Sequence, residues 1–195
     1  MLEKQVYEKM KSLYWKVWSW TVRWKQTTTP RSNTNDMTRV NDPHLLKILN
    51  TGYVFVWLNL SNTHWNNWFN DSIDWSNFHS GYSLQNDYKL RYALKDTKFW
   101  GSYITDLIKK YPEVDSNKVS SYLKKNPNIV EENIEYFKQE ISYLWSGLKL
   151  IALGSKTYKL LDKYLWESYK IFLIKHYSYR IWKENYKKEV LSILR

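Results

Sequence analysis

The sequence predicts an α/β fold in which helices cover both faces of a mostly parallel sheet. Four apolar, β-branched segments alternate with segments of helical periodicity, and this alternation is typical of parallel strands joined by helical crossovers. The chain has 195 residues, of which 43% are hydrophobic, so it is long and apolar enough for one packed domain. It has no cysteine, which excludes disulfide scaffolds, thiolate metal sites and a cysteine nucleophile.

The first fifty residues predict a helix and a polar connection. Apolar residues recur every three or four positions over residues 2–20, which predicts an amphipathic helix. Four tryptophans follow one another in this region and either pack in the core or face a partner: Trp15, Trp18, Trp20 and Trp24. Residues 26–42 predict a polar loop, and residues 43–50 a short helix. We therefore expect residues 1–50 to pack, as a helix and a loop, on a domain formed by residues 51–195.

The remaining elements follow from composition and periodicity. The predicted strands are rich in β-branched and aromatic residues and cover 53–60, 99–109, 148–153 and 170–175. The predicted helices cover 88–97, 116–125, 128–146, 155–164 and 181–195. Residues 61–87 predict a long loop, and loops of this length are often functional.

The charge of the chain favours a polyanionic partner. Its 30 Lys and Arg residues exceed its 19 Asp and Glu residues, which gives a net charge of +11. Twelve tryptophans and 17 tyrosines supply rings that stack on unpaired bases. Three alternatives remain open: the codon bias of an A/T-rich genome, an anionic membrane surface, and an acidic protein partner.

No targeting or membrane-spanning segment is expected. The first residues are charged throughout, unlike a signal peptide, and no apolar run approaches the roughly 18 residues of a membrane span. These features predict a soluble, cytoplasmic protein, and the lack of cysteine fits a reducing compartment.

The candidate site residues stand where the predicted strands end, because ligands of parallel sheets bind outside the carboxyl ends of the strands. Asn59 and Ser61 follow the first strand, where an amide either orients a water or forms a turn. Thr105, Asp106 and Lys109 end the second strand. The carboxylate of Asp106 either reads a base edge, caps a helix or forms a surface ion pair.

Two further candidates lie in loops. His176 follows the fourth strand, where a neutral imidazole can donate a hydrogen bond to a developing anion, although a lone histidine is more often simply packed or exposed. Phe78 lies in the long loop, where it either stacks on a planar ligand or plugs the core. The four histidines lack metal-ligand spacing, and no glycine-rich phosphate loop or GxSxG motif is present. We therefore expect neither a metal nor another cofactor.

Five segments, taken in order, resemble the uracil-DNA glycosylase superfamily. They are VFVWLNLS (54–61), SNFH (76–79), DYKLRYALKDTKFWGSYITDLIKKY (87–111), LIALGSKTYKLL (150–161) and HYSYRIWKENYKKEVLSIL (176–194). The chain looks closest to the small uracil-glycosylase-like proteins of low-GC Gram-positive bacteria and their mobile elements. The resemblance implies a three-layer α/β/α sandwich on a four-stranded, mostly parallel sheet.

The resemblance also implies a function. Members of this superfamily flip a base out of the DNA stack and hydrolyse its N-glycosidic bond. On this pattern Asn59 positions the attacking water, and His176 stabilises the leaving base. The substrate contacts would be Ser61, Phe78 (stacking), Thr105, Asp106 (base edge) and Ser178. The DNA contacts would be Lys109, Tyr179 and Arg180.

The motifs depart from the superfamily at four positions. Trp57 stands in place of a glycine, Leu60 and Tyr177 in place of prolines, and Asp106 in place of an asparagine. A carboxylate lacks the N–H donor of an amide, so the base preference is left open. Trp57 and Leu60 favour an alternative, a catalytically inactive nucleic-acid-binding module on the same fold. A third hypothesis gives the Trp-rich N-terminal helix a protein partner.

Overall fold

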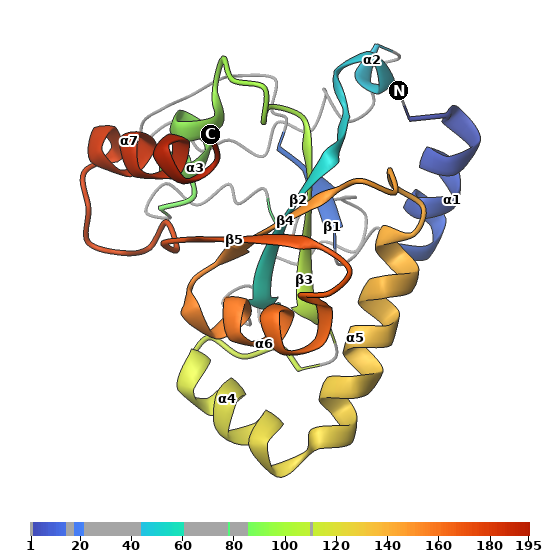
Figure 1. The fold of residues 1–195 in the computed structure, drawn as a ribbon, viewed down its shortest axis with the longest axis vertical. Helices are drawn as coiled ribbons and strands as arrows, with labels where there is room; N and C mark the ends of the chain where they lie inside the picture. The colour runs from blue at the N-terminus through green and yellow to red at the C-terminus, as the bar shows by residue number, and fades with distance from the viewer. Residues whose placement is uncertain (1, 15–17, 22–43, 61–77, 79–85, 110) are drawn as a thin grey trace, which may run out of the picture.

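The computed structural model describes residues 2–14, 18–21, 44–60, 78, 86–109 and 111–195 (Figure 1). These residues form a mixed α/β structure with a five-stranded, mostly parallel sheet. The predicted α/β class is confirmed, whereas the predicted number of four strands is wrong by one. The predicted loop at 26–42, and all of the loop at 61–87 except Phe78, Asn86 and Asp87, lie outside the described residues.

The parallel part of the sheet consists of the four strands expected from the sequence. They are β2 (Asn50–Asn59), β3 (Ser102–Ile108), β4 (Lys149–Leu153) and β5 (Lys170–Ile174). The strand order is β1-β3-β2-β4-β5. The chain passes from β2 to β3 on one side and then to β4 on the other, so the order reverses between β2 and β4. In open parallel sheets this switch point is where a ligand binds, outside the carboxyl ends of the strands.

The fifth strand is β1 (Trp18–Trp20), which pairs antiparallel with β3 at the edge of the sheet. The predicted helix over 2–20 is therefore wrong at its end, because α1 covers only Lys4–Tyr14. Trp20 is 1% exposed and packs edge-to-face on Tyr103, with 5.1 Å between ring centroids. Burial of this indole against β3 outweighs the helical periodicity that continues through the segment.

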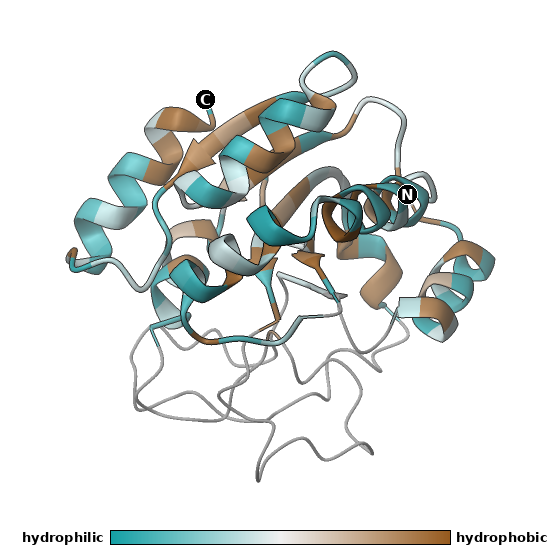
Figure 2. Ribbon diagram, turned by 90° about the horizontal axis from the view of Figure 1, so that it is seen from below, coloured by the Kyte–Doolittle hydropathy of each residue, from teal (hydrophilic) through white to brown (hydrophobic). Residues whose placement is uncertain are grey.

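Helices pack against both faces of the sheet. Alternate side chains of β2 point to opposite faces, so Val54 and Val56 enter one core while Phe55 and Trp57 enter the other. The first core also contains residues of α1, α4 (Ser116–Lys125), α5 (Pro127–Ile141) and α6 (Ser155–Leu165). The second contains residues of α3 (Tyr88–Leu94) and α7 (Lys183–Ile193), and the short α2 (Leu45–Ile48) precedes β2. In Figure 2 the strands are largely hydrophobic and the helices carry both colours, as amphipathic helices do.

The predicted first residues of the helices agree with the structure more often than the predicted last residues do. α4 begins at Ser116, as predicted, and Asp115 caps it by accepting a hydrogen bond from the backbone N–H of Asn117 at 2.8 Å. α5 starts on a proline in its first turn and stops at Ile141, five residues before the predicted end at 146. None of the helices in the described ranges is long and apolar enough to cross a membrane.

Candidate functional site

The two predicted catalytic residues lie at the carboxyl edge of the sheet. Asn59 is the last residue of β2, and His176 follows the end of β5 by two residues. Strand β4 lies between these two strands. Asn59 is therefore next to the switch point, and His176 is one strand further along the same edge.

Gly154 keeps the space next to His176 open. It has a φ of +91°, which favours glycine, and it joins β4 to α6. The nearest described atom to a side chain placed there would be the Cβ of His176, at 3.9 Å. The first turn of α6 therefore lies beside His176 without an intervening side chain, and its N–H groups carry partial positive charge.

The ring of His176 is neutral and has a defined tautomer. Its Nδ1 lies 2.7 Å from the Ser178 hydroxyl oxygen and accepts a hydrogen bond from the Ser178 backbone N–H at 3.2 Å. Because a backbone N–H can only donate, Nδ1 carries no proton, and the neutral ring holds its proton on Nε2. Burial lowers the pKa of His176 from 6.5 to about 4. At neutral pH the ring is therefore an uncharged donor through Nε2–H.

An aromatic cluster connects His176 with Phe78. The Trp57 ring lies 5.1 Å from Phe78 and 6.0 Å from Tyr177, centroid to centroid. Tyr177 in turn lies 4.3 Å from the His176 ring. Trp57 is 8% exposed and belongs to the core on the side of α3 and α7. The indole therefore occupies the space at the end of β2.

Charged groups lie next to this cluster. Asp106 is 2% exposed and is the cross-strand partner of Trp57 in the β2–β3 register. Asp87 and Arg91 form an ion pair at 2.6 Å at the start of α3. Burial raises the pKa of Tyr177, the negative charges of Asp87 and Asp106 raise it further, and Arg91 and the Trp57 indole oppose the rise. The phenol of Tyr177 thus stays protonated close to both acids.

The indole N–H of Trp57 is a buried donor without a hydrogen bond to any described residue. It is close enough to the Tyr177 hydroxyl to lower the pKa of that phenol, but the two groups do not adopt hydrogen-bond geometry. Leaving such a donor unpaired costs about 1–3 kcal/mol. A ligand carbonyl would satisfy it.

Asn59 holds the end of β2 to the segment that follows β3. Its amide nitrogen donates to the carbonyl oxygens of Leu60 and Glu113, both at 2.8 Å, and lies 3.3 Å from that of Tyr111. These bonds fix the orientation of the amide and use its N–H groups. Only the oxygen Oδ1 is left to accept a hydrogen bond from a water.

Thr105 and Lys109, predicted to contact substrate and DNA, lie instead on the opposite face of the sheet. The Lys109 ammonium forms an ion pair with Glu140 of α5 at 2.6 Å and donates to the Thr105 hydroxyl at 2.8 Å. Glu140 also accepts a hydrogen bond from the Tyr103 hydroxyl at 2.6 Å. Successive residues of a strand face opposite ways, so Asp106 and Thr105 cannot serve one site. The group around Lys109 joins β3 to α5.

The loop after His176 presents exposed rings and a cation. Tyr179 is 59% exposed, Arg180 is exposed, and the ammonium of Lys89 in α3 anchors the loop by donating to the Tyr179 carbonyl at 3.1 Å. Trp182, which the sequence did not single out, is 80% exposed and follows directly. Ser61 lies outside the described residues, so its predicted substrate contact has no structural counterpart.

The structure therefore brings together only some of the predicted residues. Phe78, His176 and Asp106 lie next to the Trp57–Tyr177 pair, Ser178 contacts the His176 ring, and Asn59 lies at the same edge. The Asp87–Arg91 pair was not predicted, although an acid and an arginine four residues apart at a helix start are a recognisable signal. The described residues contain no group of three or more His, Asp or Glu side chains that could hold a metal ion.

Comparisons with protein-family models, with curated proteins and with solved structures give no match to this chain.

Proposed function

We propose that this chain is a DNA glycosylase-like protein that binds DNA, takes a flipped base at the carboxyl edge of its sheet and hydrolyses the N-glycosidic bond. The observation that carries the proposal is the state of His176. A neutral imidazole with its proton on Nε2, next to Gly154 and the first turn of α6, is suited to meet negative charge on a leaving base. The resemblance of the sequence to the uracil-DNA glycosylase superfamily supports the same assignment.

The chemistry assigns each group a role. The oxygen of a water bonds to the sugar C1′, the bond from C1′ to the base nitrogen breaks, and the base leaves with the electron pair. His176 donates a hydrogen bond to the base oxygen as it becomes negative. The attacking water gives up one of its protons to solvent, and the departed base takes up a proton from solvent. Asn59, through Oδ1, accepts a hydrogen bond from the attacking water. The sugar is left with a hydroxyl at C1′.

The base itself would contact the other groups of the site. Phe78 offers a ring for stacking, and the unpaired N–H of Trp57 meets a base carbonyl. Asp106, an acceptor when ionised, favours a base edge that presents N–H groups. Tyr179 and Arg180 contact the DNA outside the pocket. Base preference would thus differ from that of an asparagine-containing site.

One observation favours a second candidate, a catalytically inactive nucleic-acid-binding module. Trp57 packs between Phe78 and Tyr177 and fills the end of β2. If the indole stays in place when DNA binds, a flipped base has no room beside it. The protein would then bind DNA through its exposed loop and positive charge alone.

A base-excision assay distinguishes the two candidates. The protein is incubated with single- and double-stranded oligonucleotides that carry uracil, hypoxanthine, xanthine or modified pyrimidines, and alkali-labile abasic sites are counted. Excision by the wild type that His176→Ala and Asn59→Ala abolish supports the enzyme. Lys159→Gln, which removes an exposed charge of α6, is the matched control and should retain activity.

If neither the wild type nor Trp57→Gly excises a base from any substrate while both still bind DNA, the enzyme is contradicted and the binding module is supported. If the wild type excises no base and Trp57→Gly does, the indole blocks the site. Absence of DNA binding at low salt contradicts both candidates.

A further inference from the structure

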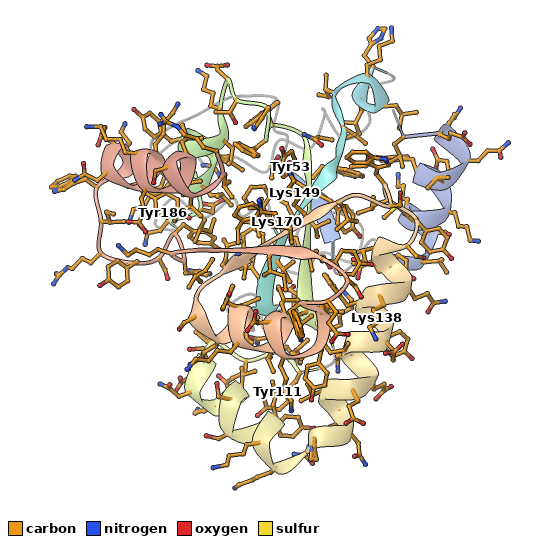
Figure 3. The ribbon with its side chains drawn as sticks, in the orientation of Figure 1. Tyr53, Tyr111, Lys138, Lys149, Lys170 and Tyr186 are labelled. Carbon is orange, nitrogen blue, oxygen red and sulfur yellow. The ribbon has the colours of Figure 1, made fainter. Side chains whose placement is uncertain are left out.

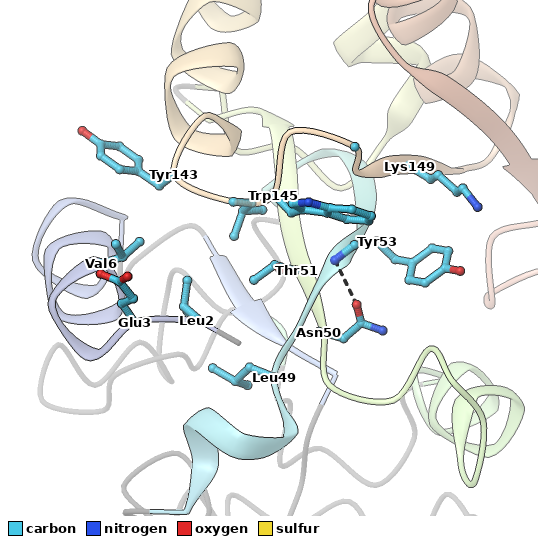
Figure 4. A pocket seen from close by; sticks show the side chains of 13 residues that line it. Leu2, Glu3, Val6, Leu49, Asn50, Thr51, Tyr53, Tyr143, Trp145 and Lys149 are labelled. Atoms are coloured by element: carbon cyan, nitrogen blue, oxygen red, sulfur yellow. Dashed lines mark hydrogen bonds between the residues drawn. The ribbon is translucent and has the colours of Figure 1, made fainter.

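A second candidate site lies at the amino edge of the sheet, at the end opposite to His176. It is a cavity of about 580 Å³ between α1, the start of β2 and the turn that leads into β4 (Figure 4). This volume is within the range of pockets that hold small organic ligands. The residues that matter for its chemistry are Trp145, Tyr53, Lys149, Glu3 and Asn50.

Trp145 is exposed and yet held in place. The residue is 62% exposed, although its ring packs against two glycines of the cavity wall. A Cβ on Gly52 would lie 3.6 Å from the indole, and one on Gly147 would lie 3.5 Å from it. The ring thus lies directly against both glycines, at distances where a Cβ would make ordinary contact with it. A large aromatic surface fixed beforehand loses little entropy when a planar ligand stacks on it.

The same cavity has a positively charged side. Figure 4 shows Tyr53 and Lys149 on one side of Trp145, and Leu2, Val6 and Leu49 on the other. The Lys149 ammonium lies 5.6 Å from the centre of the Tyr53 ring, in cation–π contact. An anionic group bound here would meet a cation that is already positioned.

A second lysine, Lys170, lies next to Lys149 just outside the residues that line the cavity. Lys149 and Lys170 are direct cross-strand partners in β4 and β5, and they lie close together near Tyr53 in Figure 3. Like charges placed opposite each other destabilise a sheet. No carboxylate among the described residues forms an ion pair with either lysine. An anion at this position would offset the repulsion.

Asn50 fixes the backbone that shapes the cavity. Its side-chain oxygen accepts a hydrogen bond from the Gly52 N–H at 2.9 Å, drawn as a dashed line in Figure 4. Its amide nitrogen donates to the Lys98 carbonyl at 2.6 Å. Glu3, exposed at the rim, supplies an acceptor opposite the lysine side. The walls thus combine an aromatic surface, a positive side and a carboxylate.

We propose that this cavity binds a nucleoside phosphate, with the planar base against Trp145 and the phosphate at Lys149 and Lys170. The aromatic surface matches the face of a base, and the paired lysines match the charge of a phosphate. The carboxylate of Glu3 would accept a hydrogen bond from an N–H of the base. The nucleotide is either free or one unit of a single strand. The site is independent of the function proposed for the carboxyl edge, because it shares no residue with it.

Calorimetric titration of the purified protein tests this site. The ligands are thymidine, thymidine 5′-monophosphate, inorganic phosphate and an eight-residue oligothymidylate. We expect the monophosphate to bind at least tenfold more tightly than thymidine or phosphate alone. Binding of the oligonucleotide with equal or greater affinity per site identifies a single strand as the source, and weaker binding identifies the free nucleotide.

Two variants and one control assign the binding to the cavity. Trp145→Ala should weaken monophosphate binding at least tenfold, while Lys149→Gln should weaken the monophosphate and leave thymidine unchanged. Lys159→Gln carries the same charge change on α6 and should bind as the wild type does. Circular dichroism confirms that each variant is folded.

The proposal is overturned if no ligand binds at millimolar concentration, or if Trp145→Ala and Lys149→Gln bind as the wild type does. If both variants weaken monophosphate binding while oligonucleotide binding is insensitive to them, the strand binds elsewhere and the free nucleotide is the occupant of the cavity. Loss of base excision or of DNA binding in His176 variants would leave these titrations unaffected.

Discussion

The backbone N–H of Ser178 donates a hydrogen bond to Nδ1 of His176 over 3.2 Å, and the Ser178 hydroxyl lies 2.7 Å from the same atom. Two residues of one loop thus set which nitrogen of the imidazole carries the proton. The geometry is local, since it needs only the turn that follows β5. Its chemical consequence is a donor, Nε2–H, directed away from the loop.

The stability of the protein should depend on pH through His176. Its pKa is lowered from 6.5 to about 4 by burial, so between these values the unfolded chain binds a proton that the folded chain does not. The free energy of unfolding should therefore fall as the pH decreases from 6.5 to 4. Urea unfolding of the wild type and His176→Gln across this range measures it. Parallel curves for the two proteins would contradict the lowered pKa.

Trp57 should contribute to stability, because its indole is buried in the core on the side of α3 and α7. Trp57→Ala removes a buried indole and should lower the free energy of unfolding by about 3–5 kcal/mol. Trp57→Phe keeps contacts with Phe78 and Tyr177 and removes the unpaired N–H, so it should cost less than about 1.5 kcal/mol. Urea denaturation compares the two. Equal losses would show that the indole N–H is paired in solution.

Substitutions of Lys109 and Glu140 should have non-additive effects on the free energy of unfolding, because the two side chains form an ion pair. Lys109→Met leaves the carboxylate of Glu140, which is 0% exposed, without its cation and should cost about 3–5 kcal/mol. Adding Glu140→Gln removes the buried charge and keeps an acceptor for the Tyr103 hydroxyl. The double variant should recover most of the loss. A double-mutant cycle by chemical denaturation measures the coupling, and simple additivity would contradict it.

Gly101 should not tolerate a side chain. Its φ is +81°, and a Cβ there would lie 2.0 Å from the carbonyl oxygen of Ile48. Gly101→Ala should therefore cost more than the roughly 1–3 kcal/mol of backbone strain alone. Gly147→Ala, where a Cβ would make ordinary contact at 3.5 Å, should change stability by less than about 1 kcal/mol. Thermal unfolding of the two variants provides the comparison, and similar melting temperatures would disagree with it.

Arg180 should contribute one phosphate contact if the loop after β5 binds DNA. Arg180→Gln should then reduce the slope of log affinity against log salt by about 0.9, because one fewer counterion is released. Fluorescence anisotropy of a labelled duplex over a range of salt concentrations measures the slope. Lys159→Gln serves as the charge-matched control on α6. An unchanged slope in the Arg180 variant would exclude this loop from the interface.

The helices and parallel strands could be predicted because their signals are local. α4 begins at a capping aspartate and α5 at a proline, and both features are visible in the sequence. The strands β4 and β5 are short apolar runs, and both were predicted to within one residue. Strand β1 was missed, because Trp18–Trp20 has no strand signal of its own and is stabilised by pairing with β3.

The candidate site could be predicted only in part for a similar reason. Carboxyl ends of parallel strands meet at one edge, so placing Asn59 and His176 there required only the α/β class. Which side chain points to which face depends on register. Lys109 looked like a phosphate ligand in sequence but pairs with Glu140, which is 31 positions away and buried on α5.

Periodicity and capping act over a few residues, so the amino-acid sequence was enough to predict the α/β class, the parallel strands and most helix starts. Tertiary packing was needed to show that Trp57 fills the end of β2, that Asp106 and Lys109 face opposite sides, and that Trp145 lies against two glycines above a cavity. These features arise from contacts between residues far apart in the chain. Their energies depend on burial and distance, which become defined only when the sheet and helices are packed.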